Sequence, residues 1–494
     1  MTAGRRRLLV AVLIAAYGAY QVVHLGGFTW DSDEGINVMK ARLLLQGARL
    51  YADVWADQPP GFTVVLAGAF GALGQSMAVA RGVALAHALL ALAAAAGLAV
   101  AAGGGAVAAA AAVLVLGLAP NAFWASRAAM IGLPALSLAM AGMVAVLWFA
   151  RTRRRPWLAA AGLLLALGLL EKLIGAYLLV PVALVLVRTR GAAPRSLAGD
   201  ALALAAGAAL PLLATALAFD VRAMLEQAVG TVAAARGAYG RGDDAQDLAW
   251  RANKLAFWLR HDHLFLVGPT VVGALRLARE RSTAALALLS WLGLTVAALL
   301  AQTPLWPKHH ILALLVVLAP LAALGIEAAA RAPADWRAGR RAWPVVAAVG
   351  LVAGLLGVPA ALRADAARLT VLPFKESGTL PSTESWRYQH DAAQLLRRAT
   401  VPGDVVLTDH LVVAFEAGRS VPPALAVLSG KRLAVGGLSG ADIVAEAEAA
   451  GPAAVLLWDG DRLSRLPEVV AWVEANYARA GEAGGGLWRL WLRR

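Results

Sequence analysis

Cysteine is absent from this chain of 494 residues, and charged residues are scarce. Without cysteine, the chain has no disulfides, no thiolate nucleophile and no Cys-ligated zinc or iron–sulfur site. Charged side chains make up 15% of the residues and hydrophobic ones 60%, against about 25% and 45–50% in soluble domains. This composition excludes a single soluble domain and a disordered chain, and it predicts a helical protein that crosses the membrane several times.

Several motifs that bind nucleotides or metal ions are also missing. The segment nearest to a G-x-x-x-x-G-K-[ST] loop, Gly430-Lys431-Arg432, lacks the first glycine and the final hydroxyl residue. There is no G-x-G-x-x-G after a predicted strand and no H-E-x-x-H. His261-Asp262-His263 has metal-ligand residue types, but a third ligand is not evident, and the edge of a span is the favoured interpretation. The sequence therefore argues against an ATP-driven pump or a zinc protease.

Apolar segments of the chain predict eleven membrane-spanning helices. They lie at 8–28, 79–102, 105–121, 131–150, 156–170, 173–187, 198–219, 263–279, 284–302, 310–329 and 343–362. A further apolar segment, 62–74, has only 13 residues, which is too short for a hydrocarbon core about 30 Å thick. We expect it to form an interfacial or re-entrant helix.

Basic residues orient these spans. They gather in five clusters at 5–7, 151–155, 188–195, 276–281 and 331–341. An even number of the predicted spans separates each pair of clusters, so all five can face the cytoplasm, as the positive-inside rule requires. The sequence thus predicts a multi-pass protein of the cell membrane with a cytoplasmic N-terminus and an extracytoplasmic C-terminal part.

The same clusters explain the net charge of +14. They hold 17 Lys and Arg residues with four acids nearby, so almost the whole excess lies in the predicted cytoplasmic loops. A nucleic-acid partner would need basic residues gathered on one soluble face. We therefore predict no nucleic-acid binding.

The predicted organisation is a transmembrane domain, 1–362, with outer loops 29–61 and 220–262, followed by an extracytoplasmic domain, 363–494. In this last part, expected helices at 386–399, 441–450 and 465–479 alternate with expected strands at 404–409, 453–458 and 487–492. Such alternation is typical of a small α/β domain. The predicted fold is therefore an all-α membrane domain with an α/β domain after it.

Three acids stand together directly after the first span, at Asp31, Asp33 and Glu34. Neighbouring carboxylates repel one another, which raises at least one pKa and favours a general base. The alternative is a solvated loop in which Asp31 or Ser32 caps a helix over 36–45. The spacing alone favours capping and leaves both interpretations open.

A resemblance to a known family adds to this pattern. Its motifs are Asp33-Glu34 outside the first span, then 41–47, Tyr51-Ala52-Asp53, Pro59-Pro60, the segment 168–173 and 308–312. In these motifs and in overall plan the chain resembles the protein O-mannosyltransferase and aminoarabinose-transferase group. These are GT-C integral-membrane glycosyltransferases, and the resemblance implies that a polyprenyl-phosphate carrier supplies a sugar at the outer face. Gln58 departs from the pattern, because family members often have lysine before the two prolines.

The resemblance implies that an acid of the first loop is the catalytic base. We assign this role to Asp33, with Glu34 as its helper or as an acceptor contact. Cations at outer span ends can hold the donor phosphate, and the predicted topology puts four candidates there, namely Arg127, Lys172, Lys308 and His309. The acceptor is the hydroxyl of a glycan, lipid or protein. No cofactor is required, and a divalent metal is compatible with this chemistry but not indicated.

Other interpretations of these residues stay open. Lys172 can be one half of an ion pair with Glu171, and 308–310 can be an interfacial anchor. A secondary transporter or flippase of lipid-linked sugars is the main alternative function, and it predicts charges at mid-membrane and an internal repeat. Few such charges and no clear repeat are found. A non-catalytic scaffold would leave Asp33-Glu34 without a role.

Overall fold

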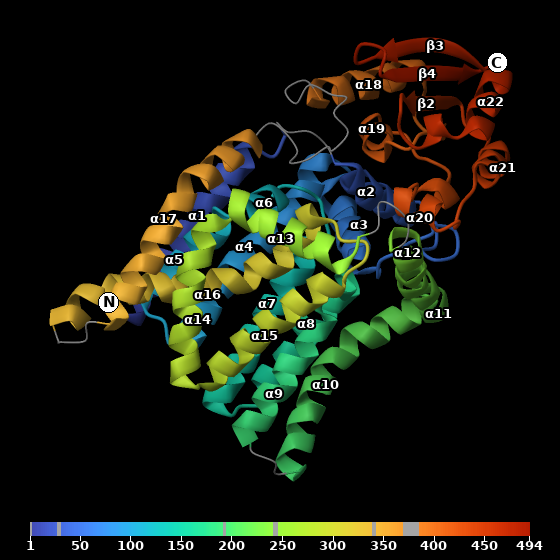
Figure 1. Ribbon diagram of the computed structural model, residues 1–494. Helices are drawn as coiled ribbons and strands as arrows, with labels where there is room; N and C mark the ends of the chain where they lie inside the picture. The colour runs from blue at the N-terminus through green and yellow to red at the C-terminus, as the bar shows by residue number, and fades with distance from the viewer. Residues whose placement is uncertain (1, 27–30, 191–193, 241–245, 338–341, 369–384) are drawn as a thin grey trace.

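The computed structural model describes residues 2–26, 31–190, 194–240, 246–337, 342–368 and 385–494. It consists of a helical bundle and a smaller domain with a sheet at one end of that bundle (Figure 1). The predicted fold class, a multi-spanning helical domain followed by a small α/β domain, is confirmed. Residues 29 and 30 of the first predicted outer loop, Asp243 and Asp244 of the second, and Arg340 and Arg341 of the last basic cluster lie outside the described residues.

The eleven predicted spans each correspond to helical structure, although not all are long. Eight segments of the described chain are long and apolar enough to cross a membrane. These eight are α1 (Ala3–Val23), α4 (Met77–Ala101), α7 (Gly132–Thr152), η1 with α9 (Leu173–Leu178 and Leu179–Arg190), α10 (Pro194–Ala218), α15 (Thr283–Ala301), α16 (Pro307–Arg337) and α17 (Ala342–Arg368).

The other three predicted spans are shorter helices. They are α5 (Ala106–Gly117), α8 (Pro156–Glu171) and α14 (Leu264–Glu280), with 12, 16 and 17 residues. Prolines set two of these lengths, because a proline has no backbone N–H to donate and therefore favours the first turn of a helix. Pro120 starts a new short helix, α6 (Pro120–Ala125), soon after α5, and Pro156 starts α8.

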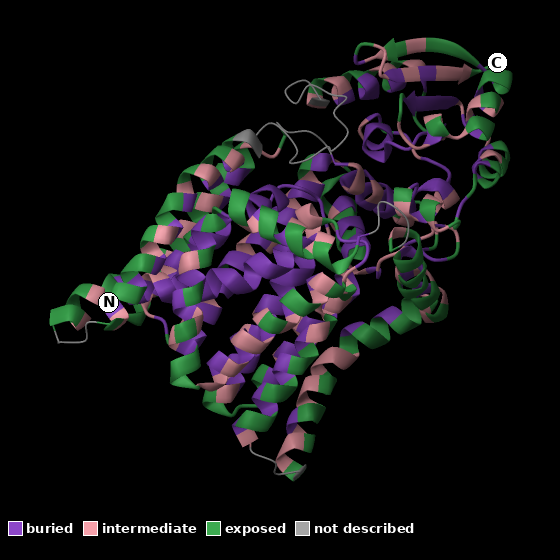
Figure 2. Ribbon diagram, viewed as in Figure 1, coloured by how far each residue is buried: buried purple, intermediate pink, exposed green. Residues whose placement is uncertain are grey.

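Burial separates the helices at the centre from those at the edge (Figure 2). The apolar part of α16 is 94% buried, and this helix packs against α14, α5, α17 and α4. Only 11% of the corresponding parts of α1 and α10 is buried, and large apolar side chains such as Leu217 on α10 are exposed. Apolar side chains without protein contact are those expected to face lipid in a membrane-spanning bundle.

Short helices cover the bundle at the end nearest the C-terminal domain. They include α2 (Ser32–Leu45), α3 (Gly61–Leu73), α11 (Val221–Leu225), α12 (Thr231–Tyr239) and α13 (Leu248–Asp262) (Figure 1). Helix α3 has 13 residues, as expected for the apolar segment that is too short to span. The N-terminus, the end of α9 and the start of α17 lie at the other end of the bundle (Figure 1).

The C-terminal domain, residues 385–494, contains one four-stranded sheet in the order β1-β2-β4-β3. The strands are β1 (Val406–Leu407), β2 (Ala454–Trp458), β3 (Tyr477–Ala483) and β4 (Trp488–Arg493). The first two are parallel, and the other pairings are antiparallel. Helices α18 (Ser385–Ala399), α19 (Leu411–Glu416), α20 (Gly430–Ala434), α21 (Gly440–Ala450) and α22 (Pro467–Asn476) surround the sheet.

One element of this domain differs from the prediction. The expected helix at 465–479 ends at Asn476, and the residues that follow form β3. Three consecutive glycines, 484–486, all have positive φ and connect β3 to β4. That turn lets the two segments pair as a hairpin, and the pairing overrides the helix-like local sequence.

The C-terminal domain is attached to the bundle through α2. A Cβ added at Gly35 would lie 2.5 Å from the backbone nitrogen of Val412, so α2 and α19 approach as closely as a glycine permits. Arg42 of α2 donates hydrogen bonds to the carbonyls of Phe415 and Arg419, and its guanidinium lies 3.9 Å from the centre of the Phe415 ring. These contacts hold the first loop and the C-terminal domain together.

Candidate active site

The three acids of the first loop form the N-terminus of α2. Asp31 is the N-cap, and its carboxylate accepts a hydrogen bond of 2.9 Å from the backbone N–H of Asp33. The Glu34 carboxylate accepts one of 3.1 Å from the backbone N–H of Asp31, which completes a capping box. The capping interpretation of Asp31 is therefore confirmed, and the helix starts at Ser32, earlier than expected.

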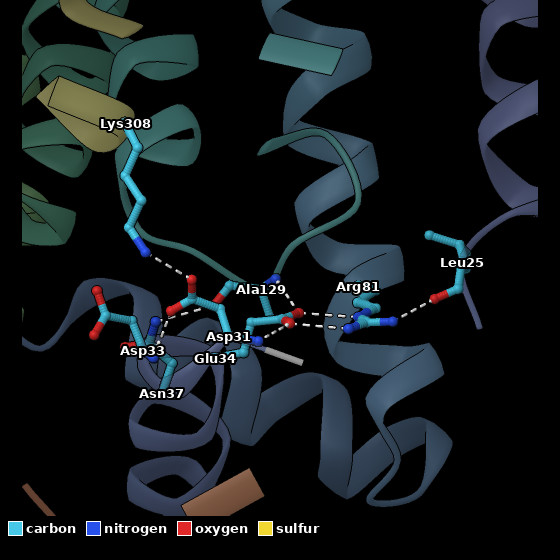
Figure 3. Close-up of polar contacts among 8 residues, drawn as sticks. All are labelled: Leu25, Asp31, Asp33, Glu34, Asn37, Arg81, Ala129 and Lys308. Carbon is cyan, nitrogen blue, oxygen red and sulfur yellow. Dashed lines mark hydrogen bonds and ion pairs between the residues drawn. The ribbon is translucent and has the colours of Figure 1, made fainter. Parts of the chain in front are cut away.

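Glu34 is fully buried, and its carboxylate is occupied by several donors (Figure 3). Arg81 of α4 donates two hydrogen bonds of 2.9 Å, one to each oxygen, and the backbone N–H of Ala129 donates a third. Together with the bond from Asp31, these contacts connect α2 to α4 and to the segment before α7. These contacts fix Glu34 at the start of α2, and its expected role as helper of Asp33 or as an acceptor contact stays a prediction.

Two of the predicted cations lie at the start of α16, next to the acids of the first loop. The Lys308 ammonium lies 3.0 Å from the Asp31 carboxylate (Figure 3). His309 Nε2 lies 3.7 Å from the Asp33 carboxylate, and the His309 ring packs against Trp124. Residues almost 280 positions apart in the sequence therefore form one cluster.

Asp33 is the acid with an open carboxylate. Its side chain points away from the Glu34–Arg81 pair, and 51% of its surface is accessible (Figure 3). Loss of water to the surrounding protein raises the pKa of Asp33, and the charge of Asp31 raises it further, against the opposing effect of Lys308. A carboxyl with a raised pKa and an accessible oxygen can take a proton from a bound hydroxyl.

Asp31 behaves in the opposite way. Burial would raise its pKa, but the charge of Lys308 and the hydrogen bond from the Asp33 backbone keep the pKa of Asp31 well below its usual range. Asp31 thus stays ionised while Asp33 titrates closer to neutral pH. Divergent pKa values in neighbouring carboxyls are typical of acid–base sites.

The cluster extends to three residues that the sequence analysis did not include. Lys40 lies on α2, seven residues after Asp33, and it is 3% exposed. Asp57 of the first loop forms an ion pair with Lys431 of α20 in the C-terminal domain. Lys40 and Asp57 act electrostatically on each other, and Asp57 and Asp33 also act on each other.

The spacing of Asp33 and Lys40 is a signal that could have been used, since residues two turns apart share one face of a helix. Nothing local to Asp57 or Lys431 indicates that they meet, because their contact depends on how the C-terminal domain docks. A further contact supports this docking, with the Arg432 guanidinium 4.7 Å from the centre of the Trp55 ring.

Lys172 joins this cluster, and Arg127 does not. The charges that act on Lys172 are those of Asp33, Lys431 and Asp57. Its sequence neighbour Glu171 instead lies 3.7 Å from His87. Arg127 is buried against the Phe123 ring, and the groups that act on it include Tyr17 of α1 and Asp365 of α17.

His, Asp and Glu are possible metal ligands, but within the described residues no group of three or more of these side chains is arranged to hold a metal ion. The His261-Asp262-His263 segment ends α13, and the His261 ring stacks on Phe257 with 3.8 Å between ring centres. The carboxylates of the cluster are instead compensated by lysines.

Solved structures with a similar fold provide an independent comparison. ArnT from Cupriavidus metallidurans bound to undecaprenyl phosphate is 13% identical, with a TM-score of 0.64 over 99% of this chain and 98% of that one. Its apo form is 14% identical, with the same TM-score over 99% and 97%. The Archaeoglobus fulgidus oligosaccharyltransferase is 14% identical, with a TM-score of 0.53 over 98% of this chain and 74% of that one.

Comparisons of sequence alone are negative. No protein-family model and no curated protein matches the chain. The structural likeness nevertheless covers the transmembrane helices and the C-terminal domain together. The whole chain therefore has the fold of the GT-C integral-membrane glycosyltransferases, the group that its sequence motifs resemble.

Proposed function

We propose that this protein is a membrane glycosyltransferase that moves a sugar from a polyprenyl-phosphate carrier to an acceptor hydroxyl, with Asp33 as the base. The observation that carries the proposal is the accessible Asp33 carboxylate, with its raised pKa, among the lysines of a GT-C fold. The similar ArnT structure is bound to undecaprenyl phosphate, which supports a lipid of this class as donor. The acceptor belongs to a glycan, lipid or protein.

The proposed reaction is a single displacement. Asp33 takes the proton of the acceptor hydroxyl as its oxygen attacks the anomeric carbon of the sugar. The bond from that carbon to the phosphate oxygen breaks, its electron pair leaves with the phosphate, and the configuration inverts. The phosphate goes from about one negative charge as a diester to about two as a monoester. Cations placed beside it therefore stabilise the transition state more than the bound donor.

The residues of the cluster have different parts in this reaction. Lys172 is the predicted cation best placed for the phosphate, because in the described chain its ammonium makes no hydrogen bond or ion pair. Lys308 is engaged by Asp31 and His309 lies beside Asp33, so they fix and tune the base. Glu34 positions the start of α2. Arg127, among aromatic groups of α1 and α6, is assigned to the packing of the bundle.

We also propose that the site faces the extracytoplasmic side. The described residues of the basic clusters occupy the ends of the helices away from the C-terminal domain, as the positive-inside rule requires for the cytoplasmic side. The N-terminus is then cytoplasmic, and the C-terminal domain and the acid–lysine cluster lie outside. A lipid carrier that presents its sugar at the outer face reaches this cluster from the headgroup layer.

Donor turnover in proteoliposomes tests the proposed function. Purified protein is supplied with a panel of polyprenyl-monophosphate sugars and a crude envelope extract as acceptor, and the freed polyprenyl phosphate is measured. Wild type should release it, and Asp33→Asn should lower the rate by about 10²–10⁴-fold. Asp53→Asn is the matched control, because Asp53 is in the same loop but pairs with Arg49 at the surface.

Two outcomes would contradict the proposal. Equal rates for wild type and Asp33→Asn would remove Asp33 as the base. Movement of labelled donor between the two leaflets, with no release of polyprenyl phosphate from any donor, would show a flippase of lipid-linked sugars.

A further inference from the structure

The C-terminal domain contributes a lysine to the cluster of the membrane domain. Lys431 lies at the start of α20, whose first turn is capped by Ser429. Its ammonium pairs with Asp57, and both side chains are largely buried, with 17% and 15% of their surfaces exposed. This ion pair joins two domains at the place where the proposed chemistry occurs, whereas a contact needed only for docking could lie anywhere on the interface.

Two other lysines act on the same acids. In the described part of the chain, neither Lys40 nor Lys172 makes a hydrogen bond or an ion pair. Only 3% of the surface of Lys40 is exposed. A largely buried lysine without a hydrogen-bond acceptor is unfavourable. Such a group indicates an anion that is bound during function.

Asp57 is the common neighbour of all three lysines. It bonds to Lys431, and it acts electrostatically on Lys40 and Lys172. Asp33 also acts on Lys40 and Lys172. With every group ionised, three positive charges face two negative ones, and the excess rises to two when Asp33 carries a proton. The cluster therefore has the charge to hold one more anion of one or two units.

We infer that Lys431 of the C-terminal domain is a phosphate ligand together with Lys40 and Lys172, and that it exchanges Asp57 for the phosphate of the lipid. This inference rests on the proposed function, which supplies the phosphate. Asp57 holds Lys431 in place when no phosphate is bound. The C-terminal domain thereby completes the binding site of the membrane domain, and the lipid phosphate is bound by both domains.

The charge of the phosphate determines whether the diester of the donor or the monoester that leaves is bound more tightly. The cluster has an excess of positive charge, so it favours the doubly charged monoester over the singly charged diester. Lys431 should therefore contribute more to the transition state, where the monoester charge develops, than to donor binding. Loss of Lys431 should therefore lower kcat and have a smaller effect on KM.

The test measures binding of undecaprenyl phosphate to the full-length protein in lipid nanodiscs, without sugar or acceptor. Lys431→Ala should weaken binding by about tenfold or more, because it removes a hydrogen bond between two charged groups. Asp57→Asn should bind at least as tightly as wild type, because it removes the anion that competes for Lys431. Arg465→Ala is the control, since Arg465 is an exposed cation of the same domain.

The two variants separate phosphate binding from docking. If the ion pair only holds the domains together, Asp57→Asn and Lys431→Ala break it equally and must weaken binding alike, which would overturn the inference. Equal affinity in wild type and Lys431→Ala would overturn it too and leave the proposed function intact. No binding by wild type would overturn both. Lys40→Met gives a second variant, with weaker binding expected, in case Lys431→Ala does not fold.

Discussion

The buried ion pair between Glu34 and Arg81 gives a prediction whose size follows from the structure. Their side chains are 0% and 1% exposed, and two hydrogen bonds of 2.9 Å join them. Glu34→Ala leaves the Arg81 guanidinium buried without its carboxylate, and the backbone N–H groups of Ala129 and Asp31 lose their acceptor. Breaking one partner of such a pair costs about 3–5 kcal/mol. We expect Glu34→Ala to lose stability in this range.

A double substitution shows whether this cost comes from the uncompensated charge. Replacing a whole buried ion pair by apolar side chains of similar volume is often close to neutral. Glu34→Leu combined with Arg81→Met should therefore be more stable than Glu34→Ala alone. Thermal unfolding in detergent measures the stability of wild type, Glu34→Ala and the double variant. Arg49→Ala is the control, because its ion pair is exposed and its loss costs at most about 1 kcal/mol. A Glu34→Ala protein as stable as this control would refute the reasoning.

Activity adds a second measurement at the same position, with Glu34→Gln as the variant. Because Glu34 fixes the start of α2, Glu34→Gln should lower the rate and leave the pH dependence of the remaining activity unchanged. A helper in proton transfer would behave differently, since its loss would move the pH at which activity falls. A shifted pH profile for Glu34→Gln would therefore show that Glu34 takes part in the proton transfer.

Three further predictions concern the base, the domain interface and the topology. Asp33 must be ionised to accept a proton, so activity should fall as the pH drops through its raised pKa. Asp31→Asn should move this fall to lower pH, because it removes a negative charge that raises the pKa of Asp33. An unchanged pH profile would contradict this coupling. Gly35→Ala places a methyl group 2.5 Å from the Val412 nitrogen, so it should loosen the C-terminal domain and speed its release by protease. Protease added outside intact cells should remove residues after about 368 in wild type, and protection of that part would reverse the proposed orientation.

The membrane helices were predictable because lipid imposes a local requirement. Each span needs a continuous apolar run whose backbone bonds are satisfied within the segment, so sequence alone reveals it. The limits were harder to predict where a turn or a proline cut the run, as at the end of α5, which stops at Gly117 before Pro120 starts α6. Strand β3 was missed for the opposite reason, since it exists only through its pairing with β4 across the glycine turn.

The site residues that lie at the ends of predicted spans could be predicted from the sequence. Lys172, Lys308 and His309 were chosen on that basis, and the structure brings them to the acids. Arg127 satisfied the same rule but is buried against the Phe123 ring, where Tyr17, Arg81 and Asp365 act on it. The position of a cation along a span does not determine which direction around the helix it faces. No such rule could predict Lys431, because its place in the cluster depends on the packing of a second domain.

Capping and catalysis were treated as competing explanations of the first-loop acids, and the structure shows how they combine. The capping box uses the oxygens of Asp31 and Glu34, and it brings Lys308 and Arg81 to them. Asp33 lies between these two residues, and its side chain takes no part in the box, so its carboxylate stays accessible. Burial raises the pKa of Asp33 most, and the ionised Asp31 that the cap holds two residues away raises it further. The helix cap thus contributes to the raised pKa on which the proposed base depends.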